Sequence, residues 1–213
     1  MGPFKDFVKA DEIFPDVFVI KNFLTDEECI DILNSKTDNF DTHPQEIKSF
    51  FQLGKSNIII DRLKKYVIDD LIVYESTTGT VMKKGMHHPV HYDNPYGYLD
   101  REANLSIIPG EPVIKLKSHA WGTVLYLSNF SGGEIFYPNH MDYYSPKMGD
   151  LLVHSSEVDM PHGTMTAKDN NRHIHTTFFY RLLDVPKRYM DEGLKTESDI
   201  MQDKYGWAKW LNV

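Results

Sequence analysis

The sequence is poor in cysteine, because Cys29 is the only one among 213 residues. A single thiol cannot form an intramolecular disulfide, which favours a reducing compartment over an oxidising one. Cys29 lies in the run TDEECIDIL, where Ile30 and Leu33 continue the apolar positions of a helix. We therefore expect a small buried hydrophobic residue rather than a reactive thiol.

Long apolar runs are also missing. No stretch approaches the ~20 apolar residues that cross a bilayer, and the opening MGPFKDFVKADE is charged throughout, unlike the apolar centre of a secretory signal. Lysine and arginine (23) are outnumbered by aspartate and glutamate (31), which gives a formal net charge of −8. This balance argues against a broad nucleic-acid surface, which needs clustered basic side chains. We expect a cytoplasmic protein with no membrane association and no nucleic-acid partner.

The amino-terminal third predicts a strand followed by two helices. Residues 13–24 form a short β-prone segment that is interrupted by Pro15. Thr25 then opens an acidic turn with Glu28 three positions on, which is a capping-box pattern for the start of a helix. The run 58–73 has apolar residues at helical spacing, so it predicts a second amphipathic helix that gives way to a strand near its end.

From about residue 74 the pattern changes to short β-prone runs separated by Gly, Pro, Asn and Asp. The runs are YESTTGTVM, HHPVHYDN, AWGTVLYLSN, GEIFYP, DYYSP, DLLVHSS, MPHGTMTA and RHIHTTFFYRLL. Regular short strands with turn residues between them are typical of an all-β sandwich or barrel. We predict one α+β domain over 1–213, with a strand and helices in 13–73, a jelly-roll-like core at about 74–183 and a polar C-terminal tail at 184–213.

Two segments lack a clear strand pattern. Residues 94–119 form a long polar connection with three prolines, and connections of this length are often functional or mobile. The tail carries Trp207 and Trp210, three positions apart, which either pack a terminal helix onto the domain or belong to an interface.

A candidate metal site begins in the run HHPVHYDN. His91 and Asp93 are two positions apart, and on a strand this spacing places both side chains on one face. An imidazole beside a carboxylate provides two ligands of a 2-His-1-carboxylate triad, which leaves metal positions open for a co-substrate and dioxygen. His-x-Asp alone is common by chance, so a surface pair is the alternative interpretation of these two residues.

The second histidine must come from another strand. The candidates after Asp93 are His119, His140, His154, His162, His173 and His175. Only His162 has a basic residue ten positions later in a strand-like run, namely Arg172, and Asn170-Asn171 suit a turn that would pair the two runs as a hairpin. Arg172 would then point into the cavity of His162, where a guanidinium can hold a carboxylate through paired hydrogen bonds. The two histidines that follow Arg172 would face outward.

Taken together, these motifs resemble one family, the prolyl 4-hydroxylase branch of the 2-oxoglutarate/Fe(II)-dependent dioxygenases. FLTDEECIDIL is similar to that branch's amino-terminal strand-helix entry, YLSNFSGGEIFYP to its YLN…GGET-F segment, and SPKMGDLLVHSS to its P-x-x-G-D-aliphatic strand. The spacing up to the first metal ligands is also similar, over Met82, Gly85, His88, His91 and Asp93. His162 with Arg172 fills the closing His-x10-Lys/Arg position, and the resemblance covers about residues 17–183 in the same order.

The resemblance implies a double-stranded β-helix (jelly-roll, cupin-like) core with flanking N-terminal helices. It implies that His91, Asp93 and His162 hold Fe(II), that Arg172 anchors 2-oxoglutarate as co-substrate, and that dioxygen is consumed, with ascorbate as a reductant. The implied activity is hydroxylation of a peptidyl proline with release of succinate and carbon dioxide. A protein or peptide is therefore the expected partner.

The chain departs from the family pattern near the co-substrate, since Met82 and His88 stand where the family usually carries tyrosine. We expect Tyr126 or Thr176 to supply the missing contacts. For the substrate, the connection after Asp93 would lie at the mouth of the site. It would close over an extended peptide with Tyr96 and Tyr98, while Trp121 would line the pocket.

Two other functions fit the same residues. The first is the same chemistry on a free amino acid, another protein side chain or a nucleobase. The nucleobase branch normally carries a second arginine soon after the first, whereas the next one here is Arg181, nine positions after Arg172. The second is a catalytically inactive metal-binding module, against which stands the presence of all three ligand types together with the anchoring arginine.

Overall fold

The computed structural model describes residues 2–5, 9–42, 48–93, 109–156 and 160–187. The helices are α1 (Asp26–Asn34) and α2 (Ser56–Tyr66). The strands are β1 (Asp11–Phe14), β2 (Val17–Ile20), β3 (Lys36–Thr42), β4 (Lys48–Leu53), β5 (Ile72–Val73), β6 (Thr78–Met82), β7 (Val113–Tyr126), β8 (Ile135–Tyr137), β9 (Asp142–Tyr144), β10 (Leu151–Ser155), β11 (Gly163–Thr164) and β12 (Arg172–Pro186).

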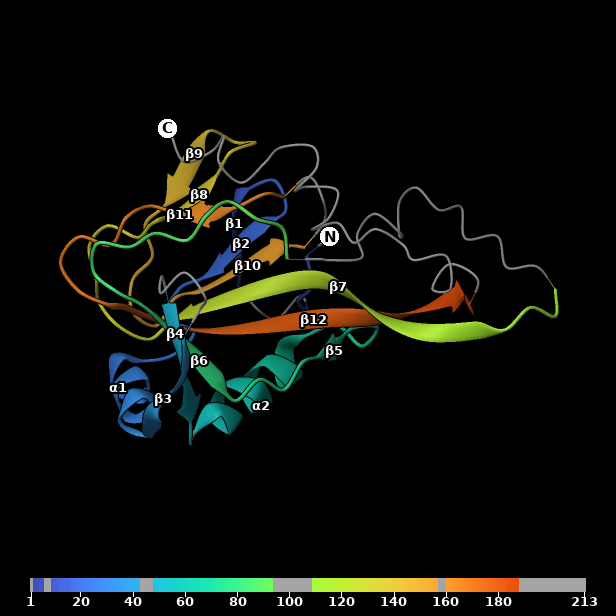
Figure 1. Ribbon diagram of the computed structural model, residues 1–213, viewed down its shortest axis with the longest axis horizontal. Helices are drawn as coiled ribbons and strands as arrows, with labels where there is room; N and C mark the ends of the chain where they lie inside the picture. Colours follow the sequence, from blue (N-terminus) through green and yellow to red (C-terminus); the bar gives the residue numbers. More distant parts are fainter. Residues whose placement is uncertain (1, 6–8, 43–47, 94–108, 157–159, 188–213) are drawn as a thin grey trace.

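These strands form two antiparallel sheets. The large sheet has nine strands in the order β1-β2-β10-β7-β12-β6-β4-β3, with β5 added beside β12, and the small sheet has the order β11-β8-β9. The helices lie on one side of the large sheet and the small sheet on the other (Figure 1). This arrangement confirms the predicted α+β fold with a jelly-roll core.

Each face of the large sheet carries its own apolar core. The core on the helix side includes Cys29, Ile32, Ile59, Leu63, Leu125, Val153 and Phe179. The core between the sheets includes Val17, Val19, Val124, Tyr126, Ile135, Tyr137, Leu152 and Ile174. Alternation along each strand explains the division, because neighbouring residues of a strand point to opposite faces.

The first helix begins where the sequence predicts. The Thr25 side chain accepts a hydrogen bond from the Glu28 backbone N–H at 3.2 Å, and the Glu28 carboxylate accepts one from the Thr25 N–H at 2.9 Å. This capping box satisfies two backbone donors that the helix leaves free. The second predicted helix, 58–73, ends earlier: Val67 is extended, and the run continues into β5 as expected.

Two details of the sequence interpretation are wrong. The hairpin of β3 and β4 lies between the two helices, in a stretch for which no strand was predicted. The connection 94–119 ends earlier, because β7 already begins at Val113; its residues 94–108 lie outside the described part of the chain, as do Trp207 and Trp210.

The predicted hairpin between the runs HGTMTA and RHIHTTFFY is also wrong. β11, which opens the first run, pairs with β8 in the small sheet, whereas β12 lies between β6 and β7 in the large sheet. The Asn170-Asn171 segment therefore crosses from one sheet to the other. None of the described helices is long and apolar enough to cross a membrane.

The histidines after Arg172 lie on the face of β12 opposite to it, as predicted, but this face is covered rather than exposed to solvent. His173 lies with its ring edge toward Phe51, and His175 is 1% exposed with Nε2 2.9 Å from the Ser76 carbonyl oxygen. The expectation that they face outward neglected the helix-side core that packs against this face of the sheet.

Acid is expected to destabilise the fold through His175. Burial lowers the pKa of His175, although its hydrogen bond to Ser76 opposes the shift. The unfolded chain therefore binds a proton that the folded one does not, so this stability is present above the unfolded pKa of about 6.5 and is lost as the pH falls below it. We expect denaturant titrations from pH 7.5 to 5.5 to show a falling free energy of unfolding. The fall should be shallower in His175→Gln, by up to about 1.4 kcal/mol per pH unit; parallel curves for the two proteins would contradict this.

Candidate metal centre

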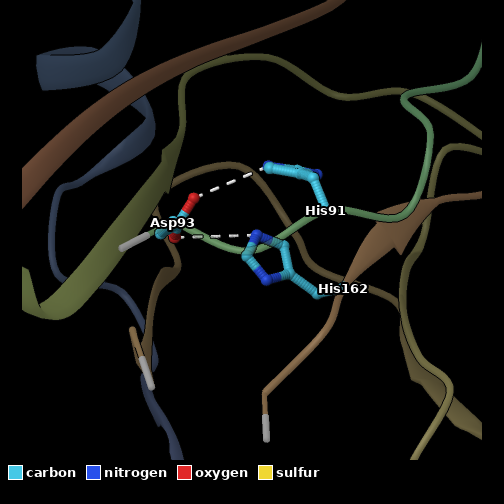
Figure 2. A group of neighbouring side chains, drawn as sticks. All are labelled: His91, Asp93 and His162. Atoms are coloured by element: carbon cyan, nitrogen blue, oxygen red, sulfur yellow. Dashed lines mark ion pairs between the residues drawn. The ribbon is translucent and has the colours of Figure 1, made fainter. Parts of the chain in front are cut away.

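His91, Asp93 and His162 come together from two segments that are far apart in the sequence, and their side chains point toward one another (Figure 2). The backbone holds the two histidines in register: the His91 N–H donates to the His162 carbonyl at 2.9 Å, and the His162 N–H donates to the His91 carbonyl at 3.0 Å. This is an isolated antiparallel bridge and not the strand predicted for the run HHPVHYDN. The bridge nevertheless brings the three side chains to one place.

The spacing of the three side chains fits a metal ion. His91 Nε2 lies 3.5 Å from Asp93 Oδ1, and His162 Nε2 lies 3.6 Å from Asp93 Oδ2. One ligand atom from each residue lies within 4.8 Å of the other two. An ion bonded at about 2.1 Å to one atom of each residue would hold these atoms about 3–4 Å apart, so the three side chains lie within reach of one ion.

Both histidine rings are oriented by the backbone. His91 Nδ1 lies 2.9 Å from the Pro89 carbonyl oxygen, and His162 Nδ1 lies 3.2 Å from that of Met160. A carbonyl oxygen only accepts, so Nδ1 of each ring carries the proton and Nε2 keeps its lone pair. In both rings the free lone pair is on the nitrogen nearest Asp93, which is the arrangement that a metal ligand requires.

The protonation states also suit a metal. Burial lowers the pKa of His162 well below its ordinary value, with His154 adding to the effect, so its ring is neutral. Burial alone would raise the pKa of Asp93, but the neighbouring His162, His154 and His91 outweigh it and hold that pKa well below the usual range. A neutral imidazole and an ionised carboxylate are the forms that bind metals.

Arg172 is a buried guanidinium that has no counter-charge among the described residues. Its side chain is 4% exposed, and its guanidinium carbon lies 5.1 Å from the ring centre of Tyr126 and 5.8 Å from that of Phe130. One nitrogen lies 3.4 Å from the Tyr126 hydroxyl, and Nε has no hydrogen-bond partner within the described segments. In the described part of the chain no carboxylate pairs with it. A buried, unpaired cation is costly, and this group is therefore suited to an anionic ligand.

The double glycine between YLSNF and EIFYP makes room for this arginine. Gly133 has a φ of +66°, which glycine adopts without strain, and a Cβ there would lie 3.3 Å from Arg172 Cδ and 3.3 Å from Met82 Cε. Met82 is paired with Arg172 across β6 and β12. Met82, which stands where the prolyl 4-hydroxylase branch usually carries tyrosine, therefore lies next to Arg172.

Of the other residues predicted to bind co-substrate or substrate, two lie on the same side of the large sheet as Arg172. Tyr126 lies beside Arg172, and Thr176 is half-buried on the same face of β12, opposite Val124. Trp121 does not line the site: it lies on the helix side of β7, against Phe18, because alternation along the strand turns it away. Tyr96 and Tyr98 lie outside the described residues.

Three further side chains lie at the site, and two of them, His119 and His154, were predicted only as candidates for the second ligand histidine. His154 Nε2 lies 3.0 Å from Asp93 Oδ2, and the Tyr137 hydroxyl lies 2.9 Å from His154 Nδ1. His119 Nδ1 lies 3.1 Å from the backbone oxygen of Asp93. In the strand DLLVHSS, His154 is two positions after Leu152 and shares its face, which points to the core between the sheets. A histidine on this apolar face was the sequence signal for a buried polar role.

The large and small sheets have the fold of solved prolyl hydroxylase structures. The structure is similar to that of the viral collagen prolyl hydroxylase of Paramecium Bursaria Chlorella virus-1 in its 2OG complex. The TM-score is 0.52 with 16% sequence identity, covering 78% of this chain and 96% of that one. For a truncated form of the same viral enzyme the TM-score is 0.50 with 17% identity, covering 84% and 99%.

The sequence alone gives no such match: no protein-family model and no curated protein matches it. At these identities the structural likeness establishes the fold. The activity has to be argued from the residues of the site.

Proposed function

We propose that this chain is an Fe(II)- and 2-oxoglutarate-dependent dioxygenase that hydroxylates a C–H bond, with a peptidyl proline as substrate. The observation that carries the proposal is the combination of His91, Asp93 and His162 with the buried Arg172, which pairs with no carboxylate among the residues that the structure describes. A metal-binding module would need only the first three residues. The arginine has a task only if a carboxylate-bearing ligand enters the same site.

In this proposal the two imidazoles and the Asp93 carboxylate hold Fe(II), and Arg172 binds the remote carboxylate of 2-oxoglutarate through charge-assisted hydrogen bonds. Its Nε and terminal nitrogens offer the donors, since within the described part of the chain their one hydrogen bond is that to the Tyr126 hydroxyl. Tyr126 and Thr176 would add contacts to the same co-substrate. When bound, iron and 2-oxoglutarate supply the oxidative chemistry, in which succinate and carbon dioxide leave and a hydroxyl is added to the substrate.

The protein's own part is to position these groups and to keep water away from them. His162 and Arg172 are buried, at 5% and 4% exposure, and the buried Tyr137 contacts His154 and His162. The pKa of Tyr137 is raised well above its ordinary value by burial and by the nearby Tyr126 and Asp93, so its hydroxyl stays protonated. The site therefore has fixed donors and a fixed metal-binding carboxylate, and it needs little rearrangement during turnover.

The substrate class rests on the fold and on the motifs. The similar viral enzyme is a collagen prolyl hydroxylase, and the motifs of this chain occur in the order found in the prolyl 4-hydroxylase branch. We propose that residues 1–213 form one oxygenase domain that acts on a peptide.

The test is succinate formation by anaerobically iron-loaded protein that is given 2-oxoglutarate, dioxygen and ascorbate. Proline-rich peptides are compared with matched peptides in which alanine replaces each proline. We expect succinate to rise only with the proline peptides, together with a gain of one oxygen atom in the peptide. Slow succinate formation that no peptide changes would refute proline as the substrate. No succinate under any condition would refute the proposed oxygenase activity.

A further inference from the structure

We propose that His154, itself held by Tyr137, is a positioning residue that fixes the metal-binding carboxylate of Asp93 and is not a metal ligand. This inference rests on the proposed metal function of Asp93. It assigns a task to two residues, one on β10 and one on β8, that the His-x-Asp…His pattern does not include.

The three side chains form a buried hydrogen-bonded chain. The Tyr137 hydroxyl lies 2.9 Å from His154 Nδ1, and His154 Nε2 lies 3.0 Å from Asp93 Oδ2. Tyr137 is fully buried, His154 is 1% exposed, and the Asp93 side chain is 10% exposed. With so little water nearby, each partner depends on the others, and such a chain holds its members in one geometry.

The directions of the hydrogen bonds determine the state of the ring. An ionised carboxylate only accepts, so His154 Nε2 must carry a proton and donate it to Asp93. A neutral ring then has its lone pair on Nδ1, where it accepts from the Tyr137 O–H. His154 Nε2 therefore has no lone pair for a metal, although its ring centre lies only 4.1 Å from that of His162. In contrast, His91 and His162 have their protons on Nδ1.

The surrounding backbone is adapted to this contact. Gly122 is paired with His154 across β7 and β10, and a Cβ at Gly122 would lie 2.6 Å from Asp93 Oδ2 and 2.8 Å from His154 Nε2. Any larger residue would push the carboxylate and the ring apart. On the other side, His119 Nδ1 lies 3.1 Å from the Asp93 backbone oxygen and its ring stacks on Phe178. Asp93 is therefore fixed through both its carboxylate and its main chain, although it follows an irregular segment.

The two oxygens of the Asp93 carboxylate therefore have different roles. The hydrogen bond from His154 occupies Oδ2 and prevents rotation of the carboxylate, so Oδ1 is presented to the metal. Partners that orient a ligand in this way typically contribute about 10–100-fold to metal affinity.

The test measures metal binding in the absence of turnover. Apo-protein is titrated with Co(II) by absorbance, for wild type, His154→Phe, His154→Gln, Tyr137→Phe and Tyr144→Phe. Tyr144 is the matched control, since its hydroxyl also bonds a carboxylate, but that of Asp150, at 3.0 Å, and not that of Asp93. Thermal unfolding of each apo-protein reports on the fold.

We expect His154→Phe to bind Co(II) about 10–100-fold more weakly than wild type. His154→Gln should recover part of this loss, because its amide can still donate to Asp93. Tyr137→Phe should weaken binding to a smaller degree, and Tyr144→Phe should leave it unchanged. If His154→Phe does not fold, the comparison of His154→Gln and Tyr137→Phe with Tyr144→Phe carries the test.

Two results would overturn the inference while leaving the proposed function intact. The first is wild-type metal affinity in both His154→Phe and Tyr137→Phe. The second is a pulsed EPR count, on Cu(II)-loaded protein, of three imidazole ligands in wild type and two in His154→Phe, which would make His154 a ligand. Absence of metal binding by wild type would instead overturn the proposed function itself, and the inference with it.

Discussion

Replacing Asp93 by alanine is expected to abolish 2-oxoglutarate turnover and to weaken Fe(II) binding by more than about a hundredfold. Loss of a group that merely orients a ligand costs about 10–100-fold in metal affinity, and Asp93 is the only anionic member of the cluster. Without it, two neutral imidazoles would face a divalent cation with no compensating charge. The measurement is an anaerobic Fe(II) titration combined with succinate detection.

The control for this variant is Asp142→Ala, which removes an exposed carboxylate from β9. It should bind metal and turn over as wild type does. Thermal unfolding of apo-Asp93→Ala checks that the fold persists, since His154 loses its acceptor in this variant. Full succinate production by folded Asp93→Ala would refute the assignment of the triad.

Replacing Arg172 by methionine is expected to have opposite effects on function and on stability. The affinity for 2-oxoglutarate should fall on the order of a hundredfold, because removing one partner of a buried charge pair costs about 2–5 kcal/mol. The free energy of unfolding of the apo-protein should rise, since burial of an unpaired charge is costly and the contacts with Tyr126 and Phe130 offset only part of it. Calorimetric 2-oxoglutarate titration and denaturant unfolding measure the two quantities.

Arg181→Met is the matched control, because it removes a guanidinium from the same strand. That side chain is half exposed and lies 3.5 Å from Asp70. Co-substrate affinity should be unchanged in this protein. If Arg172→Met instead lowers stability and keeps its affinity for 2-oxoglutarate, then Arg172 serves the fold and the anchor lies elsewhere.

The parts of the fold that the sequence predicted are those set by local chemistry. Thr25 and Glu28 form a capping box through contacts within four residues, so the start of α1 could be read directly. The alternation of apolar residues likewise identified the runs that became β7, β10 and β12. Strand partners are not local, and for this reason the hairpin predicted through Asn170-Asn171 was wrong: a turn-forming pair does not determine which strand its flanks will join.

In the candidate site, too, the sequence predicted the residues that have a characteristic spacing and missed those that only the folded sheets bring together. His91, Asp93, His162 and Arg172 have characteristic spacings, and the structure places the first three within reach of one ion. His154 and Tyr137 could not be assigned in the same way, because their contacts with Asp93 arise only when β10 pairs with β7 and the small sheet closes over them. Trp121 was misplaced because its alternation along β7 was not compared with that of Tyr126.

The central claim is that the metal cluster and Arg172 form one site for 2-oxoglutarate, and calorimetry under anaerobic conditions tests it most directly. The protein is titrated with 2-oxoglutarate and with pyruvate, which lacks the remote carboxylate, before and after loading with Fe(II). We predict that Fe(II) strengthens the binding of both ligands, and that 2-oxoglutarate binds far more tightly than pyruvate in wild type but not in Arg172→Met. Equal affinities for the two ligands in wild type, or a 2-oxoglutarate affinity that Fe(II) does not change, would contradict the claim.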